Sequence, residues 1–395
     1  MKTNQSNKIQ KLLLSTVIGI TALVFSNCKK ENEMAPVQTE TVASVDLDNE
    51  VMAVVFTSIP LGDYDLTSAL PAGYVKDGSV DYTTYVQAAI NKNSNITFPA
   101  FPILINDTGL FLRSNSRITF LTGGAVKLKG SSKEVYNILR LSEVNNVTLV
   151  NPVVIGDRYT HIGLTGEGGV GIGIRGSNNI TLINPNIREC WGDGIYIGQA
   201  RNIINSTNVT IKNGYFKRNR RAGISIISVD GLLLDKLYAG YHDGVSPMCG
   251  LNFEPNNPEC TMKNIKVNNV TTIKNGGQGI QIGLRTMVGK GDRFVDFSFS
   301  NIKDTGSKLA FKSVCSPLIG TNGGQIYGTV NVTNASWNAN SSGFPLYYST
   351  NQPNFKLALS GISVTNLAGT SLTQTEIGVL IKRCVQGVGS YTILP

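Results

Sequence analysis

Residues 171–176 read GIGIRG, and this order of glycine, apolar residue, any residue and second apolar residue returns four times further on. The later copies are GIYIGQ at 194–199, GISIIS at 223–228, GLNFEP at 250–255 and GIQIGL at 279–284. Alternating apolar residues are typical of a β-strand with one buried face. A repeat of 23 to 29 residues indicates a solenoid, because a single coil cannot bury its apolar face alone.

A second series of short segments lies between the glycine-led ones. Its members are NNVTLVNP at 145–152, NNITLINP at 178–185, NVTIKNG at 208–214, GLLLDKL at 231–237 and NIKVNNV at 264–270. The asparagines suit bends that need a positive φ or a side-chain cap. The pattern predicts parallel β coils stacked about 4.8 Å apart. An antiparallel sandwich would need tight two-residue turns, which are not evident in the sequence.

The composition agrees with an all-β chain and bounds its organisation. Charged residues make up only 15% of the sequence, and 42 residues are glycine, which favours turn-rich β structure. The segment DYTTYVQAAINK at 81–92 predicts one helix that caps the stack, with Asp81 as its N-cap and Tyr85, Val86, Ala89 and Ile90 on its apolar face. We expect no further helix, and a β-helix domain over residues 59–395.

The N-terminus has the features of a signal for export. Lys8 and Lys11 precede an apolar run at 12–25 that is too short for a membrane span. The run ends in LVFSNCKK, which resembles the lipobox of bacterial lipoproteins, although Asn27 replaces the usual small residue. The resemblance implies a signal peptide at 1–27, lipidation of Cys28, a flexible tether at 28–58 and anchoring in the cell envelope, at the outer membrane. An uncleaved anchor helix is the alternative.

Charge and cysteine content narrow the function. Removal of residues 1–27 removes three lysines and no acid, so the net charge falls from +9 to +6, which favours acidic partners such as uronate glycans. No stripe of basic residues with interleaved aromatics suggests nucleic-acid binding. Two histidines argue against a multi-histidine metal site. We expect the five cysteines after Cys28 to be core residues, with a bridge between Cys249 and Cys260 as an alternative.

The chain resembles the right-handed parallel β-helix proteins of the pectate-lyase superfamily, which include tailspike-like members. The resemblance rests on residues 81–106, on the NNVTLVNP and NNITLINP pair and on WGDGIYIG at 191–198. It implies a single-stranded right-handed parallel β-helix. The superfamily contains polysaccharide lyases, glycoside hydrolases, uronate epimerases and adhesins, so the fold alone does not fix the reaction.

The motifs of two of these enzyme classes are incomplete in this chain. Polygalacturonase-type hydrolases carry an Asn-Thr-Asp segment, a paired aspartate one coil later, and Gly-His-Gly. WGDGI can stand in the first place, but Arg220 and Arg221 occupy the place of the paired acids, and no Gly-His-Gly follows. The Asp-Pro-His-Glu signature of the epimerases is absent as well.

If the glycine-led segments stack in register, they form one face of the solenoid. Their inward positions are then Ile172, Ile195, Ile224, Leu251 and Ile280. Their outward positions are Gly173, Tyr196, Ser225, Asn252 and Gln281, and Arg175 and Glu254 follow two residues further along. Such a small or polar floor with one aromatic ring suits a sugar. We therefore predict that Arg175, Tyr196, Asn252, Glu254 and Gln281 bind substrate.

Charged residues gather just before each glycine, at a corner of the same face. This corner and the loop upstream of it supply the remaining candidates. The predicted catalytic residues are Asp193, Arg220, Arg221, His242 and Asp243, and the further predicted substrate contacts are Asp157, Arg158, His161, Glu167 and Trp191.

Each candidate also has an ordinary structural interpretation. Asp193 has the strand parity of inward Ile195 and could simply cap a turn. The two arginines could form a solvated basic edge, and the HDG segment at 242–244 could be a turn.

Two mechanisms can use these groups. In β-elimination from a uronate, a cation neutralises the carboxylate and a base removes the C5 proton. The arginines could supply the cation, His242 or Tyr196 the base, and the acids a Ca²⁺ site. Hydrolysis needs two carboxyl groups about 5 to 10 Å apart, a separation that this register predicts for Asp193 and Asp243 but not for Asp193 and Glu254.

These observations favour an exported, lipid-anchored enzyme that cleaves an acidic polysaccharide. Elimination is preferred because arginines stand where hydrolases carry acids. A hydrolase with a carboxylate pair and a non-catalytic glycan-binding β-helix stay open as alternatives. The expected partners are the polysaccharide and the membrane; a cofactor other than Ca²⁺ is not indicated.

Overall fold

The computed structural model describes residues 44–47, 50–53, 63–201, 205–289, 291–316, 323–387 and 389–394. The predicted signal peptide and Cys28 lie outside these residues. The chain divides into two units, residues 1–59 and 60–395. In the first unit, β1 (Ser44–Leu47) and β2 (Glu50–Ala53) pair in antiparallel fashion within the segment expected to be a tether. No helix in the described parts of the chain is long and apolar enough to cross a membrane.

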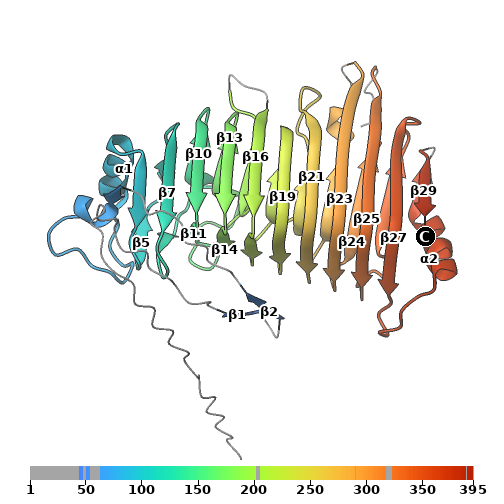
Figure 1. Cartoon of the computed structure of the whole chain (residues 1–395), viewed down its shortest axis with the longest axis horizontal. Coiled ribbons are helices and arrows are strands. Elements are labelled where there is room, and N and C mark those ends of the chain that lie inside the picture. Colours follow the sequence, from blue (N-terminus) through green and yellow to red (C-terminus); the bar gives the residue numbers. More distant parts are fainter. Residues whose placement is uncertain are drawn as a thin grey trace, which may run out of the picture. The chain divides into compact units, whose positions relative to one another are not determined.

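The second unit is a right-handed parallel β-helix, in which each turn adds strands to two long sheets (Figure 1). The ten-stranded sheet consists of β6 (Leu110–Phe111), β9 (Val135–Ser142), β12 (Gly168–Arg175), β15 (Ile195–Gly198), β18 (Ala222–Ile226), β20 (Cys249–Phe253), β22 (Gln278–Gly283), β24 (Leu309–Cys315), β26 (Leu346–Thr350) and β28 (Val385–Gly387).

The 17-stranded sheet supplies the other walls of the β-helix. It consists of β3 (Tyr64–Asp65), β4 (Asn95–Phe98), β5 (Pro102–Ile105), β7 (Ser116–Phe120), β8 (Ala125–Leu128), β10 (Asn145–Val150), β11 (Val153–Ile155), β13 (Asn178–Ile183), β14 (Asn186–Arg188), β16 (Ser206–Lys212), β17 (Tyr215–Lys217), β19 (Val229–Gly240), β21 (Met262–Ile273), β23 (Arg293–Thr305), β25 (Ile326–Asn338), β27 (Phe355–Thr365) and β29 (Tyr391–Leu394).

The glycine-led segments stack in the predicted register. Gly173 pairs with Tyr196, and the same row continues through Ser225, Asn252 and Gln281 in successive strands of the ten-stranded sheet. The predicted inward side chains are all fully buried: Ile172, Ile195, Ile224, Leu251 and Ile280. The stacking prediction is therefore confirmed, and each turn contributes its apolar side chains to one continuous core.

Asparagines at the bends explain the repeated Asn-rich segments. Asn115, Asn146 and Asn179 all have φ between 56° and 58°, a left-handed conformation that asparagine tolerates better than most residues. Asn146 donates from Nδ2 to Asn115 Oδ1, and Asn179 donates in the same way to Asn146, both at 2.8 Å. A second ladder of the same kind begins with Asn184 donating to Asn151 at 2.7 Å. The turns are thus held to one another as well as to the sheets.

The N-terminal helix α1 (Thr83–Lys92) follows the 3₁₀ turn η1 (Leu66–Ala69) and covers one end of the stack (Figure 1). Val86, Ala89 and Ile90 are buried as predicted, but Tyr85 is exposed. The N-cap is Tyr82 and not Asp81. Asp81 still stabilises the first turn of the helix, because its Oδ1 accepts the backbone N–H of Thr83 at 2.9 Å.

The expectation of no further helix is wrong. The helix α2 (Gln374–Cys384) lies near the C-terminal end of the β-helix (Figure 1). Its first turn has a capping box, in which Thr373 accepts from the Glu376 backbone and Glu376 accepts from the Thr373 backbone. Ile377 and Ile381 are buried. A second short 3₁₀ turn among the described residues is η2 (Arg285–Met287).

The five described cysteines are buried free thiols: Cys190, Cys249, Cys260, Cys315 and Cys384. The core role expected for them is confirmed, and the alternative of a Cys249–Cys260 bridge is wrong.

Candidate functional site

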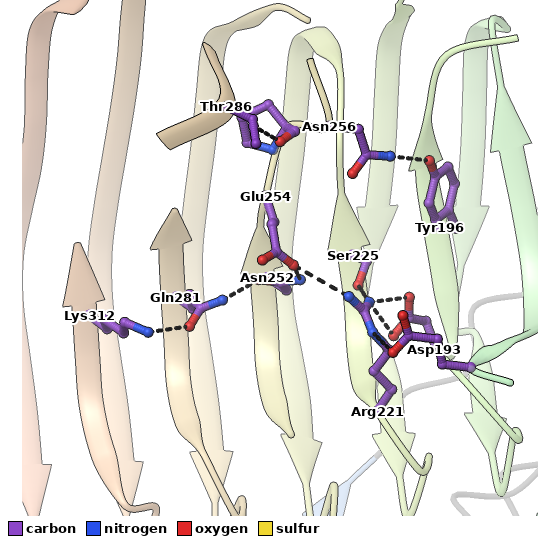
Figure 2. Close-up of polar contacts among 12 residues, drawn as sticks. Asp193, Tyr196, Arg221, Ser225, Asn252, Glu254, Asn256, Gln281, Thr286 and Lys312 are labelled. Carbon is purple, nitrogen blue, oxygen red and sulfur yellow. Dashed lines mark hydrogen bonds and ion pairs between the residues drawn. The ribbon is translucent and has the colours of Figure 1, made fainter. Parts of the chain in front are cut away.

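Arg221 is the centre of a charged cluster on the ten-stranded sheet, directly before β18 (Figure 2). Its Nη1 donates to Asp193 at 2.9 Å (Oδ2) and 3.2 Å (Oδ1), and its Nη2 donates to Glu254 Oε2 at 3.3 Å. Its Nε lies 3.4 Å from Glu167 Oε2. One guanidinium therefore contacts three carboxylates from three turns. We call Arg221, Asp193, Glu254 and Glu167 the Arg221 cluster.

Burial sets the electrostatics of the cluster. The Asp193 side chain is only 4% exposed, and this burial raises the pKa of Asp193 to about 6, even though the Arg221 charge and a hydrogen bond from Ser225 act to lower it. Burial also acts to lower the pKa of Arg221, but the three carboxylates outweigh it and hold that pKa above its usual value. Arg221 is thus a permanent cation beside an acid that can keep its proton in mildly acidic solution.

The carboxyl pairing differs from the one the register predicted. Asp193 and Glu254 were expected to lie too far apart, yet both bind the end of one guanidinium. Their oxygens must lie within roughly 8 Å of each other, given the fixed fork geometry of arginine. Asp243, the expected partner of Asp193, instead binds Arg158 Nη2 and has a side chain that is 66% exposed. Long side chains cross more turns than the backbone register alone indicates.

A chain of polar side chains extends from Glu254 along the sheet (Figure 2). Asn252 Nδ2 donates to Glu254 Oε2 at 2.9 Å, and Gln281 Nε2 donates to Asn252 Oδ1 at 3.0 Å. Lys312 Nζ then donates to Gln281 Oε1 at 3.0 Å. Asn252 and Gln281 are buried, so they support the longer side chains and do not form the surface itself.

Lys312 was not among the sequence candidates. It lies in β24 directly beside Gln281 in the row of outward positions. Extending the predicted row by one turn would have found it, but its strand lacks the leading glycine-apolar pattern. Burial lowers the pKa of Lys312 below its ordinary value.

Two arginines on the same sheet lie over aromatic rings. The guanidinium carbon of Arg175 is 3.8 Å from the centre of the Tyr196 ring, and that of Arg140 is 4.8 Å from the centre of the Phe111 ring. Within the described residues neither arginine has an acidic partner. One face of Tyr196 is therefore occupied by Arg175, and its hydroxyl lies 3.5 Å from Asn256 Nδ2 (Figure 2).

Several candidates build the loop at 156–167 and do not face the outer surface. Buried Asp157 accepts the Ser131 N–H at 3.0 Å and the Tyr136 hydroxyl, and it lies 2.8 Å from His161 Nδ1. The His161 ring stacks on Trp191 with ring centres 4.0 Å apart. The prediction that Asp157, His161 and Trp191 contact substrate is therefore replaced by an anchoring role.

Arg220 also serves this loop. Its guanidinium lies over the Trp191 ring at 3.8 Å, and its Nη1 donates to the Gly166 carbonyl at 2.7 Å. Gly166 precedes Glu167, whose carboxylate contacts Arg221. Arg220 therefore positions a member of the Arg221 cluster, and the structure does not place it as a free cation for substrate.

His242 is buried inside the β-helix, so the expectation that it faces the same wall as Asp193 is wrong. Its ring Nδ1 accepts the backbone N–H of Asn219 at 3.2 Å, and the backbone N–H of His242 donates to Asn275 Oδ1 at 3.2 Å. Asn219 in turn accepts the Cys190 N–H. Burial lowers the pKa of His242 to about 3. The residue is a neutral member of an internal polar ladder at one corner of the turns.

The Ca²⁺ site that the sequence left possible has no matching arrangement among the described residues. Across the described ranges, no group of three or more His, Cys, Asp or Glu side chains is placed to hold a metal ion. The acids Asp193, Glu254 and Asp243 are instead bound by arginine: Asp193 and Glu254 by Arg221, and Asp243 by Arg158.

No family model matches the chain. It is 26% identical over 163 residues to the SPbeta prophage-derived protein YorA of Bacillus subtilis (strain 168), covering 37% of this chain and 28% of YorA. It is 24% identical over 220 residues to YclG of the same organism, covering 48% of this chain and 38% of YclG. The matches thus span well under half of these longer relatives.

Solved structures share the fold over most of the chain. The A-module of the Azotobacter vinelandii mannuronan C-5 epimerase AlgE4 superposes with a TM-score of 0.53 at 15% identity, over 84% of this chain and 94% of the module. An iota-carrageenase bound to iota-carrageenan fragments gives 0.55 at 12% identity, over 84% and 87%. A family 28 exopolygalacturonase of Yersinia enterocolitica gives 0.52 at 11% identity, over 87% and 80%. At these identities the likeness establishes the fold.

Proposed function

We propose that this protein cleaves glycosidic bonds of an acidic polysaccharide at the Arg221 cluster, by hydrolysis. The observation that carries the proposal is that Asp193 and Glu254 bind the same guanidinium. The upper limit of roughly 8 Å between their oxygens is compatible with a pair of carboxyl groups that act on opposite sides of one glycosidic bond. The structures of similar fold are named for action on mannuronan, carrageenan or polygalacturonate chains, which supports a glycan as the substrate.

The two acids differ in the way a hydrolase requires. Asp193, with a pKa raised to about 6, is the proton donor to the leaving oxygen. Glu254, with a 41% exposed side chain, is the carboxylate that activates water or attacks the sugar. Because the Asp193 side chain is covered by Arg221 in the free protein, proton donation requires the guanidinium to turn outward when substrate binds. A substrate carboxylate or sulfate is the group that would draw it out.

The preference for an acidic substrate has a second support. Arg140 and Arg175 lie within the same sheet without acidic partners among the described residues, and their stacking on Phe111 and Tyr196 fixes their direction. Such preorganised guanidiniums bind carboxylate or sulfate groups in a forked geometry.

The decisive experiment is digestion of polygalacturonate, alginate and iota-carrageenan, with mass analysis of the products. Hydrolysis yields new reducing ends with one added water and no ultraviolet absorption. An unsaturated, ultraviolet-absorbing product would show that the reaction is elimination and would contradict hydrolysis. Retained binding without any product from these polymers would contradict both reactions and support the non-catalytic alternative.

Elimination is the second candidate because of Lys312. Its amine has a lowered pKa and lies at the end of the polar chain that begins at Glu254, which suits a general base for a C5 proton. The base named from the sequence, His242, is buried, and Arg221 is already matched by three carboxylates. Lys312→Met should abolish elimination but leave hydrolysis at the Arg221 cluster largely intact.

We also propose that the protein is exported and lipid-anchored through Cys28. The support is the basic segment, apolar run and cysteine at its N-terminus. Metabolic labelling with a fatty acid should label the wild-type chain, whereas equal labelling of Cys28→Ser would contradict the proposal.

A further inference from the structure

A second polar surface lies on the 17-stranded sheet, across the first residues of β23, β25 and β27. Phe294 and Tyr327 occupy paired positions in adjacent turns. Their side chains point outward and are 42% and 41% exposed. The ring centres are 5.5 Å apart and the rings are inclined by 51°. The next outward row beside these rings is polar and consists of Asp296, Thr329 and Lys356.

Hydrogen-bonding groups surround a hollow beside these rings. The hollow has a volume of about 480 Å³ and is lined by Asp292, Gln325, Tyr327, Gly328, Thr329, Asn354 and Lys356. Asp292 Oδ1 accepts the Gln325 N–H at 2.8 Å, and Asn354 Nδ2 donates to Gln325 Oε1 at 3.3 Å. These bonds fix the amides and leave Asp292 Oδ2, Gln325 Nε2 and the Lys356 ammonium without a partner among the described residues.

Gly328 lines the hollow, and its backbone geometry requires a glycine. Its φ is 133°, and a Cβ at this position would overlap the Val295 carbonyl oxygen, so no other residue fits without moving the backbone. Gly328 therefore adds only backbone atoms to the lining, and the other residues that line the hollow carry side chains.

We propose that this surface binds a sugar unit of a polysaccharide chain, as a site separate from the Arg221 cluster. A sugar has an apolar ring face that packs on an aromatic side chain and hydroxyl edges that need both donors and acceptors. Phe294 and Tyr327 supply the aromatic surface for the ring face. The carboxylate, amide and ammonium groups around the hollow supply the donors and acceptors for the hydroxyl groups. The volume lies in the range of about 300 to 1,000 Å³ that is common for small-molecule sites, whereas two rings are a small apolar area for a protein partner.

Gel electrophoresis through polygalacturonate, alginate, iota-carrageenan or dextran tests the proposal, because binding retards the protein in proportion to its affinity. We expect the wild type to be retarded by at least one polymer. The double variant Phe294→Ala/Tyr327→Ala should bind that polymer about tenfold more weakly, as is typical when aromatic anchors are removed. Phe344→Ala is the matched control, since Phe344 is 44% exposed and lies outside this surface.

The outcomes separate this site from the proposed function. Retardation of the double variant equal to that of the wild type, or no retardation of the wild type by any polymer, would overturn the site. Glu254→Gln should lose cleavage and keep its retardation. A wild type that binds but cleaves nothing would contradict the proposed function alone. An unchanged melting temperature of the double variant would show that weaker binding does not come from unfolding.

Discussion

Asp193 and Glu254 come from different turns of the β-helix and bind the same guanidinium, at 2.9 Å and 3.3 Å. The cation between them lowers the repulsion that two nearby carboxylates would otherwise have. Asp193 is buried, whereas Glu254 is partly exposed. The same contact therefore gives two acids with different environments, which is the condition for separate acid and base roles.

Removing either carboxyl group should abolish most of the cleavage. We expect Asp193→Asn and Glu254→Gln each to lower kcat by about 10²- to 10⁴-fold, the range typical of general acid–base groups. Both replacements keep the shape and a hydrogen-bonding oxygen for Arg221. Asp243→Asn is the control, because its exposed carboxylate binds Arg158 outside the cluster. Equal loss of activity in Asp243→Asn would show that the effect is not specific to the Arg221 cluster.

Cleavage should decrease as the pH rises through about 6. Asp193 donates a proton in the proposed mechanism, and burial raises its pKa to about 6, so its protonated fraction falls about tenfold per pH unit above that value. The kcat/KM profile of the wild type should therefore have a basic limb near pH 6. A profile that rises through pH 6 would mean that Asp193 acts as a base or does not titrate in the reaction.

Arg221 should matter for stability as well as activity. Arg221→Gln leaves the buried Asp193 carboxylate without its cation, which costs about 3 to 5 kcal/mol at neutral pH. The cost should decrease in acid, because a protonated Asp193 needs no cation. The double variant Asp193→Asn/Arg221→Gln should recover most of the loss. Additive effects of the two substitutions in urea unfolding would contradict the coupling.

The backbone of this site could be predicted from the sequence because a period of two and a repeat of 23 to 29 residues fix it. Tyr196, Ser225 and Asn252 form one row across adjacent strands, as the alternation of apolar residues predicted. The ends of the chain were less predictable. The helix α2 starts with a capping box, but its apolar face is limited to a few buried residues, so its periodicity is weak.

The directions of the side chains could not be predicted from the sequence. His242 and Asp243 are adjacent in the chain, yet one is buried in a ladder with Asn219 and the other is exposed beside Arg158. The turn conformation decides which of the two points inward, and no spacing rule encodes it. Likewise, the reach of Arg221 to three turns depends on a flexible side chain, whereas the expected pairing of acids used only the backbone spacing.

Burial of His242 should make the protein less stable in acid. Its Nδ1 accepts a hydrogen bond from the Asn219 N–H, and protonation would break that bond and bury a charge. Burial lowers the pKa of His242 in the folded protein to about 3, whereas in the unfolded chain it is about 6.5. Below pH 6.5 the unfolded chain therefore binds a proton at His242 that the folded protein does not bind. As the pH falls from about 6.5 towards 3, the free energy of unfolding decreases by about 1.4 kcal/mol per pH unit.

His242→Asn isolates this effect, because an asparagine at this place can accept the same N–H, as Asn219 and Asn275 do in their turns. The variant loses packing and should be less stable than the wild type near neutral pH. Its disadvantage should shrink by about 2 to 3 kcal/mol between pH 7 and pH 4.5, measured by urea unfolding at each pH. Other titrating groups, including Asp193, affect both proteins alike and cancel in the difference. A difference that stays constant with pH would mean that His242 takes up its proton as readily in the folded protein as in the unfolded chain, and that the ladder does not need a neutral ring.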